Sequence, residues 1–523
     1  MSSASSQLSQ AILLFQQGKL REAEAACRAA LSSNPDDVDA LNLMGILAQR
    51  GGDLPRAIEV LSRAINIAPD VAKLYLNRGE AFRASNAFDR AVSDYRKAIE
   101  LDPNYATAYY NLGIALRAQE KLAEAIAAYR AAVGIKPDYV KAHYNLANTL
   151  RTQLDFAAAE QAYRDAIRFD PNHAEAWNNL GEMLAEQMRI DEAFDAFSRA
   201  IELKPDHAGA HFNRSFIRLL RGEYDLAWPE HEWRWKRVGS EPPAVTLGRP
   251  MWDGSDLAGK TILLHAEQGM GDTIQFVRYA TLVARERNPA RVIVACQLAL
   301  VSLIATVPGV DEVIAFDHPI PPFDEHAAIM SLPGIFRTTL QTIPAEIPYL
   351  FPDPARVERW HAKLAPMRKQ LSVGLAWAGN PVQANDRNRS ANLERLAPSL
   401  AGLANVRFFS LQKGAGREQL ARVQNVIDVV DVSEDLDDYS DTAAAIANLD
   451  VVVTVCTSVA HVAGALGKPA ITTLCFNADW RWLTERKDSP WYPTMKLVRQ
   501  TKQGDWEGVA RRVREALAER MSR

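Results

Sequence analysis

Six prolines in the first half of the chain recur every 34 residues, and this period constrains the fold more than any other feature. They are Pro35, Pro69, Pro103, Pro137, Pro171 and Pro205. Proline ends an α-helix because it lacks an N–H group and disfavours helical geometry in the preceding residue. Each unit of this length buries its apolar face only against its neighbours. The period therefore predicts a solenoid of stacked helical hairpins.

Other positions keep the same phase as the prolines. Small residues that let helices approach closely are Gly45, Gly79, Gly113, Ala147 and Gly181. Large residues, expected to fill the gap to the next repeat, are Leu61, Tyr95, Tyr129, Tyr163 and Phe197. The pattern resembles the tetratricopeptide repeat (TPR) family, a helix-turn-helix repeat of 34 residues. The resemblance implies an α-solenoid over residues 1–237, with six regular repeats and a degenerate seventh.

Five repeats carry asparagine two residues before the small position. They are Asn77, Asn111, Asn145, Asn179 and Asn213. Asparagine is a poor helix former, so five asparagines at the same position of successive repeats require an explanation. An amide both donates and accepts hydrogen bonds, so the set predicts a concave groove that binds the backbone of an acceptor polypeptide. The set resembles the asparagine ladder of TPR-bearing O-GlcNAc transferases. The alternative is that these amides bridge neighbouring helices.

The composition of the sequence changes after Arg237. Residues 238–259 are predicted to be a linker because VGSEPPAVTLGRP is rich in proline, glycine and polar residues. The segment before it contains Trp228, Trp233 and Trp235. For these tryptophans a packing seam between domains is favoured over a ligand site.

From Lys260 short β-rich runs alternate with helical patterns. The expected strands are Thr261–His265, Arg291–Ala295, Glu312–Ala315, Leu371–Ala376, Arg407–Leu411, Val426–Val429, Val451–Val455, Ala470–Leu474 and Lys496–Arg499. Such alternation predicts parallel sheets covered by helices. A break near residues 349–364 divides the region into lobes 260–355 and 356–523. Two doubly wound lobes that face each other place the ligand site in the cleft between them.

The first lobe carries a glycine-rich turn, AEQGMGD, between its first strand and a helix. Such a turn brings backbone N–H groups, here around Gly271, toward a ligand. Asp272 suits either a general base or a helix cap, and Glu267 competes for the role of base. The turn lacks the lysine of a P-loop and the spacing of GxGxxG.

The second lobe carries three polar clusters after predicted strands. Their candidate donor-binding residues are Trp377, Asn380, Arg387, Arg389, Gln412, Lys413, Thr457, Ser458 and His461. Arginines and a helix N-terminus with hydroxyl groups are suited to bind phosphate. For His461, the alternative is a histidine of the core or helix surface.

In this order the motifs resemble GT-B glycosyltransferases, specifically the heptosyltransferase-like branch (glycosyltransferase family 9). The matching segments are Gly269–Asp272, Arg387–Ser390 and Ser458, His461, Gly467 and Pro469. The resemblance covers about residues 260–500 and implies two Rossmann-like lobes with Asp272 as catalytic base. It also implies donor-phosphate contacts from Arg389 or Arg387 and from the helix start at Thr457–His461. The RNRS segment and the tryptophan-rich tail depart from the family, so the sugar does not carry over.

A TPR solenoid followed by a GT-B pair is also the layout of O-GlcNAc transferases and of TPR-bearing bacterial flagellin glycosyltransferases. The layout implies transfer of a sugar from a nucleotide-sugar to a hydroxyl of a protein, with flagellin as one candidate acceptor. Two alternatives remain open. One is a glycosyltransferase for polysaccharide or lipid-linked glycan, and the other is a non-catalytic TPR adaptor.

Composition excludes several other classes. Net charge is −4, from 60 basic and 64 acidic residues, which disfavours general nucleic-acid binding. No DxD motif is placed at a strand end, so a metal-independent enzyme with no cofactor beyond its substrate is expected; basic groups and a helix dipole would stabilise the leaving group. No apolar run reaches the ~18 residues of a membrane span, and no secretory signal is recognisable. A cytoplasmic location is expected.

Overall fold

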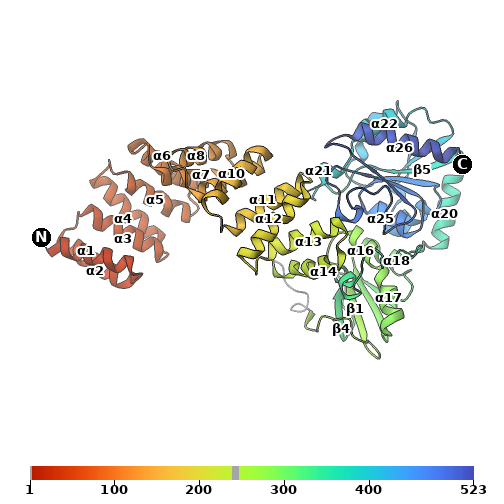
Figure 1. Cartoon of the computed structure of the whole chain (residues 1–523), viewed down its shortest axis with the longest axis horizontal. Helices are drawn as coiled ribbons and strands as arrows, with labels where there is room; N and C mark the ends of the chain where they lie inside the picture. Colours follow the sequence, from red (N-terminus) through yellow and green to blue (C-terminus); the bar gives the residue numbers. More distant parts are fainter. Residues whose placement is uncertain (1–2, 238–246, 384, 523) are drawn as a thin grey trace. The chain divides into compact units, whose positions relative to one another are not determined.

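The structure, a computed structural model, describes residues 3–237, 247–383 and 385–522 (Figure 1). The chain forms two compact units. One runs to Met183 and includes Glu202–Pro205, and the other contains Leu184–Ile201 and the chain from Asp206 onward. This division falls inside the sixth repeat, before the boundary at residue 237 expected from the sequence, because the last hairpin packs on the α/β region.

Seven helical hairpins follow one another along the N-terminal region and form the predicted α-solenoid. Their helices are α1 (Ser3–Gln16), α2 (Leu20–Ser33), α3 (Val38–Arg50), α4 (Leu54–Ile67), α5 (Ala72–Ala84), α6 (Phe88–Leu101), α7 (Ala106–Ala118), α8 (Leu122–Ile135), α9 (Val140–Thr152), α10 (Phe156–Phe169), α11 (Ala174–Glu186), α12 (Ile190–Leu203), α13 (Ala208–Arg221) and α14 (Tyr224–His231). A short 3₁₀ helix, η1 (Glu232–Lys236), follows α14.

The small and large positions of the repeat meet inside each hairpin. A Cβ atom added to Gly113 on α7 would lie 2.5 Å from Cε1 of Tyr129 on α8. The same atom added to Gly79 would lie 2.7 Å from Cε1 of Tyr95. Both tyrosine rings are fully buried. The large residue therefore fills the space within its own hairpin, and Tyr163 also interacts with Asn179 of the next repeat.

Two parallel sheets follow the solenoid (labels β1, β4 and β5 in Figure 1). The first has the order β3-β2-β1-β4 and the second the order β10-β9-β8-β5-β6-β7. The strands are β1 (Thr261–His265), β2 (Arg291–Cys296), β3 (Glu312–Ala315), β4 (Glu325–Ala328), β5 (Leu371–Ala376), β6 (Val406–Ser410), β7 (Val429–Asp431), β8 (Val451–Val455), β9 (Ala470–Leu474) and β10 (Met495–Arg499). The pairings are parallel, which confirms the predicted Rossmann-like α/β class.

Helices connect and cover the strands. They are α16 (Met270–Phe276), α17 (Arg278–Arg287), α18 (Val301–Ile304), α19 (Leu332–Ile335), α20 (Pro354–Leu364), α21 (Asp386–Arg389), α22 (Leu393–Leu400), α23 (Leu420–Val423), α24 (Tyr439–Ala447), α25 (Ser458–Ala465) and α26 (Trp506–Met521). In the described ranges of the chain, no helix has the length and apolar composition needed to cross a membrane.

The expected linker is part of the first lobe wherever it is described. Met251 pairs with His326 beside β1, and the Trp252 side chain is buried. Residues 238–246 lie outside the described residues.

Aromatic side chains join the last hairpin to the α/β region. Trp228 Nε1 donates a hydrogen bond to the Thr338 carbonyl (2.9 Å), and Trp491 Nε1 donates to the Tyr224 hydroxyl (3.2 Å). The rings of Trp228 and Trp480 pack edge to face with centroids 5.7 Å apart. Trp228 therefore lies in a packing seam, and the tail tryptophans extend the core there.

The glycine–tyrosine contact gives a stability prediction. Gly113→Val should lower the free energy of unfolding by about 1–3 kcal/mol, because the new side chain overpacks against Tyr129. Gly134→Ala is the matched control on α8, where an added Cβ meets no atom within 4 Å. It should raise the free energy of unfolding by up to about 1 kcal/mol. Urea unfolding followed by circular dichroism measures both, and equal stability of the two variants would contradict this packing.

Candidate functional site

A cleft of about 770 Å³ lies between the two sheets, both of which belong to the same compact unit. Its lining includes residues 268–272 after β1, residues 378–381 after β5 and residues 456–459 after β8. The carboxyl ends of the strands thus face the cleft from both lobes. Ligands of open parallel sheets bind at this edge.

The N-termini of α16 and α25 meet at the cleft. A Cβ added to Gly271 would lie 2.9 Å from Cδ2 of His461 and 3.8 Å from the Cα of Ser458. Glycine at this position therefore permits the two helix ends to approach. Each helix N-terminus carries partial positive charge, so their meeting point favours an anion.

Asp272 lies in the first turn of α16 and lines the cleft. One carboxylate oxygen accepts a hydrogen bond from the Gly269 N–H (2.9 Å), and the other accepts from Arg481. About a fifth of the side chain (21%) is exposed. Burial raises the pKa of Asp272, although the attraction of Arg481 acts in the opposite direction. The carboxylate thus caps the first turn of α16 and also faces the cleft.

Arg481, which lies in the C-terminal tail, binds the carboxylate of Asp272. It lies in the 3₁₀ helix η7 (Trp480–Trp482), and its side chain is buried. Its guanidinium also donates to Gln275 Oε1 (2.5 Å) and to Asp479 (3.0 Å). The ion pair joins two residues 209 positions apart, so the sequence pattern does not reveal it.

Helix α25 presents an unfilled N-terminus to the cleft. It has no side-chain cap and no acidic residue in its first turn. Thr457, Ser458 and Val459 line the cleft, and the Ser458 hydroxyl is hydrogen-bonded to the Tyr439 hydroxyl (2.5 Å). Within the described residues, the N–H groups of Ser458 and Val459 have no acceptor. Two donors are thus available to an anion.

His461 is both a core and a cleft residue. Its Nδ1 is hydrogen-bonded to the Tyr492 hydroxyl (2.9 Å), and its ring stacks on Trp482 with centroids 5.7 Å apart. Burial, followed by repulsion from Arg481 and Arg278, lowers the pKa of His461 well below the ordinary value. The imidazole is therefore neutral at physiological pH.

Three further predicted donor-binding residues line the cleft: Asn380, Arg389 and Lys413. Arg389 donates from Nε to Asp386 Oδ1 (3.0 Å), and its two terminal nitrogens have no acceptor within the described part of the chain. Lys413 donates to the Leu436 carbonyl. Both cations therefore retain N–H donors for a ligand, on the two terminal nitrogens of Arg389 and on Nζ of Lys413.

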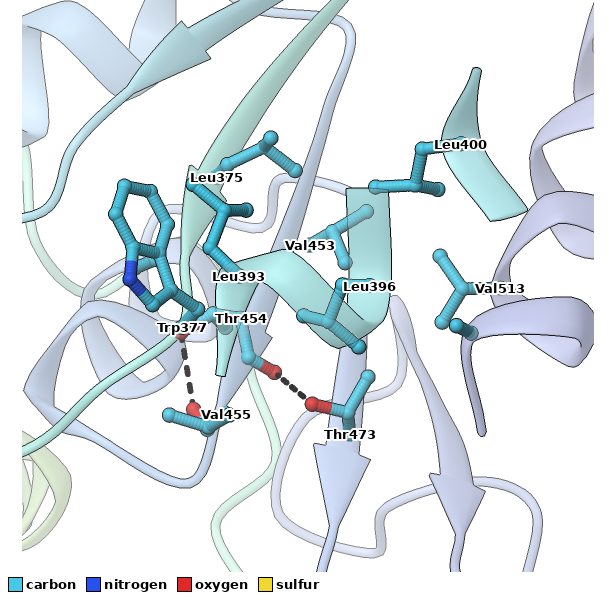
Figure 2. A pocket seen from close by; sticks show the side chains of 12 residues that line it. Leu375, Trp377, Leu393, Leu396, Leu400, Val453, Thr454, Val455, Thr473 and Val513 are labelled. Atoms are coloured by element: carbon cyan, nitrogen blue, oxygen red, sulfur yellow. Dashed lines mark hydrogen bonds between the residues drawn. The ribbon is translucent and has the colours of Figure 1, made fainter. Parts of the chain in front are cut away.

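Three other predicted residues do not line the cleft. Glu267 is bound on both oxygens by Arg234 at 2.9 Å and is absent from the lining of the cleft, which favours Asp272 of the two candidates for the base. Arg387 is exposed on the outside of its turn. Trp377 is buried, donates to the Gly416 carbonyl (3.2 Å), and lines a separate apolar pocket of about 20 Å³ with Leu393 (Figure 2).

Gln412 reaches the cleft, but its amide is used inside the protein. Its oxygen accepts from the N–H groups of Trp377 and Ala378 (2.9 Å each), and its nitrogen donates to the Ala378 and Ala415 carbonyls. The side chain therefore shapes the loops that line the cleft, and its role in donor binding stays a prediction.

The in-phase asparagines bridge neighbouring repeats. Four of them donate to the first helix of the preceding repeat: Asn77 to Asn42 (2.7 Å), Asn111 to Glu80 (2.8 Å), Asn145 to Tyr110 (3.1 Å) and Asn179 to Tyr144 (3.0 Å). This is the alternative that the sequence left open. The fifth, Asn213, lies half-buried on α13. Binding of a polypeptide along this face stays a prediction.

Sequence reasoning missed several cleft residues, among them Phe216, Met270, Met330 and Tyr439. Two of them had a signal in the sequence, because Phe216 lies three residues after Asn213 on the same helix and Met270 lies within the glycine-rich turn. Across the residues that the structure describes, no group of three His, Cys, Asp or Glu side chains is arranged to hold a metal ion.

Comparison with known proteins identifies the repeats. Residues 79–119 and 113–153 match the family described as TPR repeat, and residues 8–72 and 144–208 match the family described as tetratricopeptide repeat. The N-terminal region consists of TPR repeats. The repeats suggest that this region interacts with other proteins.

Individual relatives cover parts of the chain. Protein FlbA of Caulobacter vibrioides is 29% identical over 327 residues, which are 58% of this chain and 54% of that protein. The chain therefore spans about half the length of this curated relative. Among solved structures, the TPR protein YrrB is 22% identical with a TM-score of 0.32, covering 35% of this chain and 95% of its own. Pseudomonas aeruginosa pilF is 17% identical with a TM-score of 0.37, covering 40% and 94%.

The buried pair of Arg234 and Glu267 gives a second prediction. Both side chains are less than a tenth exposed, so Arg234→Met leaves a buried carboxylate without its partner. The free energy of unfolding should fall by roughly 3–5 kcal/mol, and adding Glu267→Gln should restore part of the loss. The control Arg486→Met breaks an exposed pair with Asp488 and should cost at most about 1 kcal/mol. Urea unfolding of the four proteins measures this, and a double variant no more stable than Arg234→Met would refute the pairing.

Proposed function

We propose that the chain is a GT-B glycosyltransferase that moves a sugar from a nucleotide-sugar to a hydroxyl of a protein, with flagellin as a candidate acceptor. One observation carries the proposal. The unfilled N-terminus of α25 and the carboxylate of Asp272 face one cleft between two parallel sheets. The helix N-terminus is suited to bind a phosphate, and the carboxylate is suited to accept the proton of a hydroxyl.

The donor phosphates bind at the start of α25. The N–H groups of Ser458 and Val459 and the free nitrogens of Arg389 supply donors and positive charge. These groups also stabilise the negative charge that develops on the leaving nucleotide, so the mechanism uses them in the place that a metal ion takes in other transferases.

Asp272 takes the proton. The acceptor oxygen attacks the anomeric carbon, its proton passes to the Asp272 carboxylate, and the bond from that carbon to the phosphate oxygen breaks. The nucleotide leaves with the electron pair. A raised pKa makes Asp272 a stronger base than an ordinary aspartate, while the ion pair with Arg481 opposes this rise and fixes the direction of the carboxylate.

The TPR repeats supply the acceptor. Their role in protein interaction supports a protein substrate over a free sugar. This argument for a protein acceptor does not depend on which protein the repeats bind.

The test incubates the full chain with nucleotide-sugars of uridine, cytidine, guanosine, adenosine and thymidine in a protein extract. Intact-mass spectrometry then records the acceptors. A sugar-sized mass increment on a protein is the expected result. Transfer only to glycan or lipid would favour the polysaccharide alternative, and absence of both transfer and nucleotide binding would favour the adaptor.

Two arginines of one turn give a matched prediction for donor binding. Arg389→Gln should weaken binding of nucleoside mono- and diphosphates by about 10- to 100-fold, because it removes a charge-assisted contact of about 1.5–3 kcal/mol. Arg387→Gln, two residues away on the exposed side, should leave the affinity unchanged. Titration calorimetry measures both, and an equal effect of the two variants would refute the assignment to Arg389.

Asp272 gives the prediction for catalysis. Asp272→Asn keeps an oxygen for the Gly269 N–H but loses the basic group, so kcat should fall by about 100-fold or more. Asp479→Asn removes another carboxylate bound to Arg481 and should cause a much smaller loss. Initial rates of transfer measure both effects. Turnover of Asp272→Asn within about 10-fold of the unmodified protein would contradict the assignment of the base.

A further inference from the structure

The cleft is lined by both polar and apolar side chains. Arg389, Lys413, Thr457 and Ser458 belong to the second lobe. Four large apolar side chains from four different elements also line the cleft, and together they are termed the apolar wall. They are Phe216 of α13, Met270 of α16, Met330 after β4 and Trp480 of η7.

These apolar side chains surround the proposed base. Met270 and Asp272 lie in the same first turn of α16, and Trp480 is the neighbour of Arg481, which binds Asp272. Helix α13 packs against η7, and the short helix that carries Met330 packs against α16. A group that binds this wall is therefore held next to the acceptor hydroxyl.

Phe216 comes from the last TPR hairpin, although the other cleft residues come from the α/β lobes. It lies three residues after Asn213, so both side chains lie on one face of α13. Its ring packs on Phe212 with centroids 4.8 Å apart and stays half-buried. Met270 is 39% exposed, which is unusual for a large apolar side chain. Both retain apolar surface for a ligand.

We propose that Phe216 and Met270, backed by the buried side chains of Met330 and Trp480, form an acceptor subsite that binds an apolar side chain of the polypeptide, close in sequence to the modified serine or threonine. This inference rests on the proposed function. A polypeptide is the favoured occupant because a helix of the last TPR hairpin contributes Phe216 to the cleft. The donor phosphates are attracted to Arg389 and to the start of α25, which lie outside the apolar wall. Phe216 therefore determines acceptor specificity.

The experiment uses the full chain, the active nucleotide-sugar from the panel above, and synthetic nine-residue peptides with one central serine or threonine. The flanking positions carry leucine or phenylalanine in one set and glycine or glutamine in the other. The apolar set should show at least about 10-fold higher kcat/KM at one or more positions, the scale set by burying one small apolar group. Phe216→Ala should reduce this preference to within about threefold.

Phe194→Ala is the matched control. Phe194 is also a half-buried phenylalanine of a repeat helix, α12, but it packs against Arg221 of α13 and is absent from the lining of the cleft. This variant should keep the preference. If Phe216→Ala does not fold, Met270→Gln on the exposed part of the same wall should reduce the preference in its place.

The outcomes separate the inference from the proposed function. Transfer to both peptide sets at equal rates, or an unchanged preference in Phe216→Ala, overturns the subsite and leaves the transferase intact. Transfer to glycan alone overturns the polypeptide occupant. If no donor gives transfer to any peptide or protein, the proposed function fails and the subsite fails with it.

Discussion

The architecture of the cleft depends on the contact between two helix N-termini, α16 of the first lobe and α25 of the second. Gly271 makes the contact possible, because any larger side chain there would collide with His461. The contact brings two partial positive charges together, which is unfavourable without nearby negative charge. Asp272 compensates the end of α16, while α25 has neither an acidic residue in its first turn nor a side-chain cap. The fold therefore leaves one helix end in need of an anion.

The last TPR hairpin is part of this site. Arg234 binds Glu267 in the loop after β1, Trp228 binds the backbone of Thr338, and Phe216 lines the cleft. The buried ion pair fixes the start of the loop that ends in Asp272. Repeats and α/β lobes thus share one compact unit from Asp206 onward, and a protein bound to the final repeat would lie beside the proposed base.

Periodic features of the fold could be predicted from the sequence. The 34-residue spacing predicts the hairpins, and strongly apolar runs such as Val451–Val455 predict the buried strands. Strand β4 was missed because EHAA lacks β-branched residues and owes its conformation to pairing with β1. Local motifs also located Asp272, Arg389 and the start of α25. Interaction partners that are distant in sequence could not be predicted from these motifs. The ion pairs of Arg234 with Glu267 and of Arg481 with Asp272 were therefore found only in the structure.

The most direct test is a crystal structure of the full chain with a nucleoside diphosphate. The account predicts phosphate oxygens about 3 Å from the N–H groups of Ser458 and Val459, with the Arg389 guanidinium turned toward them. A phosphate group bound elsewhere, with the first turn of α25 still facing solvent, would contradict it.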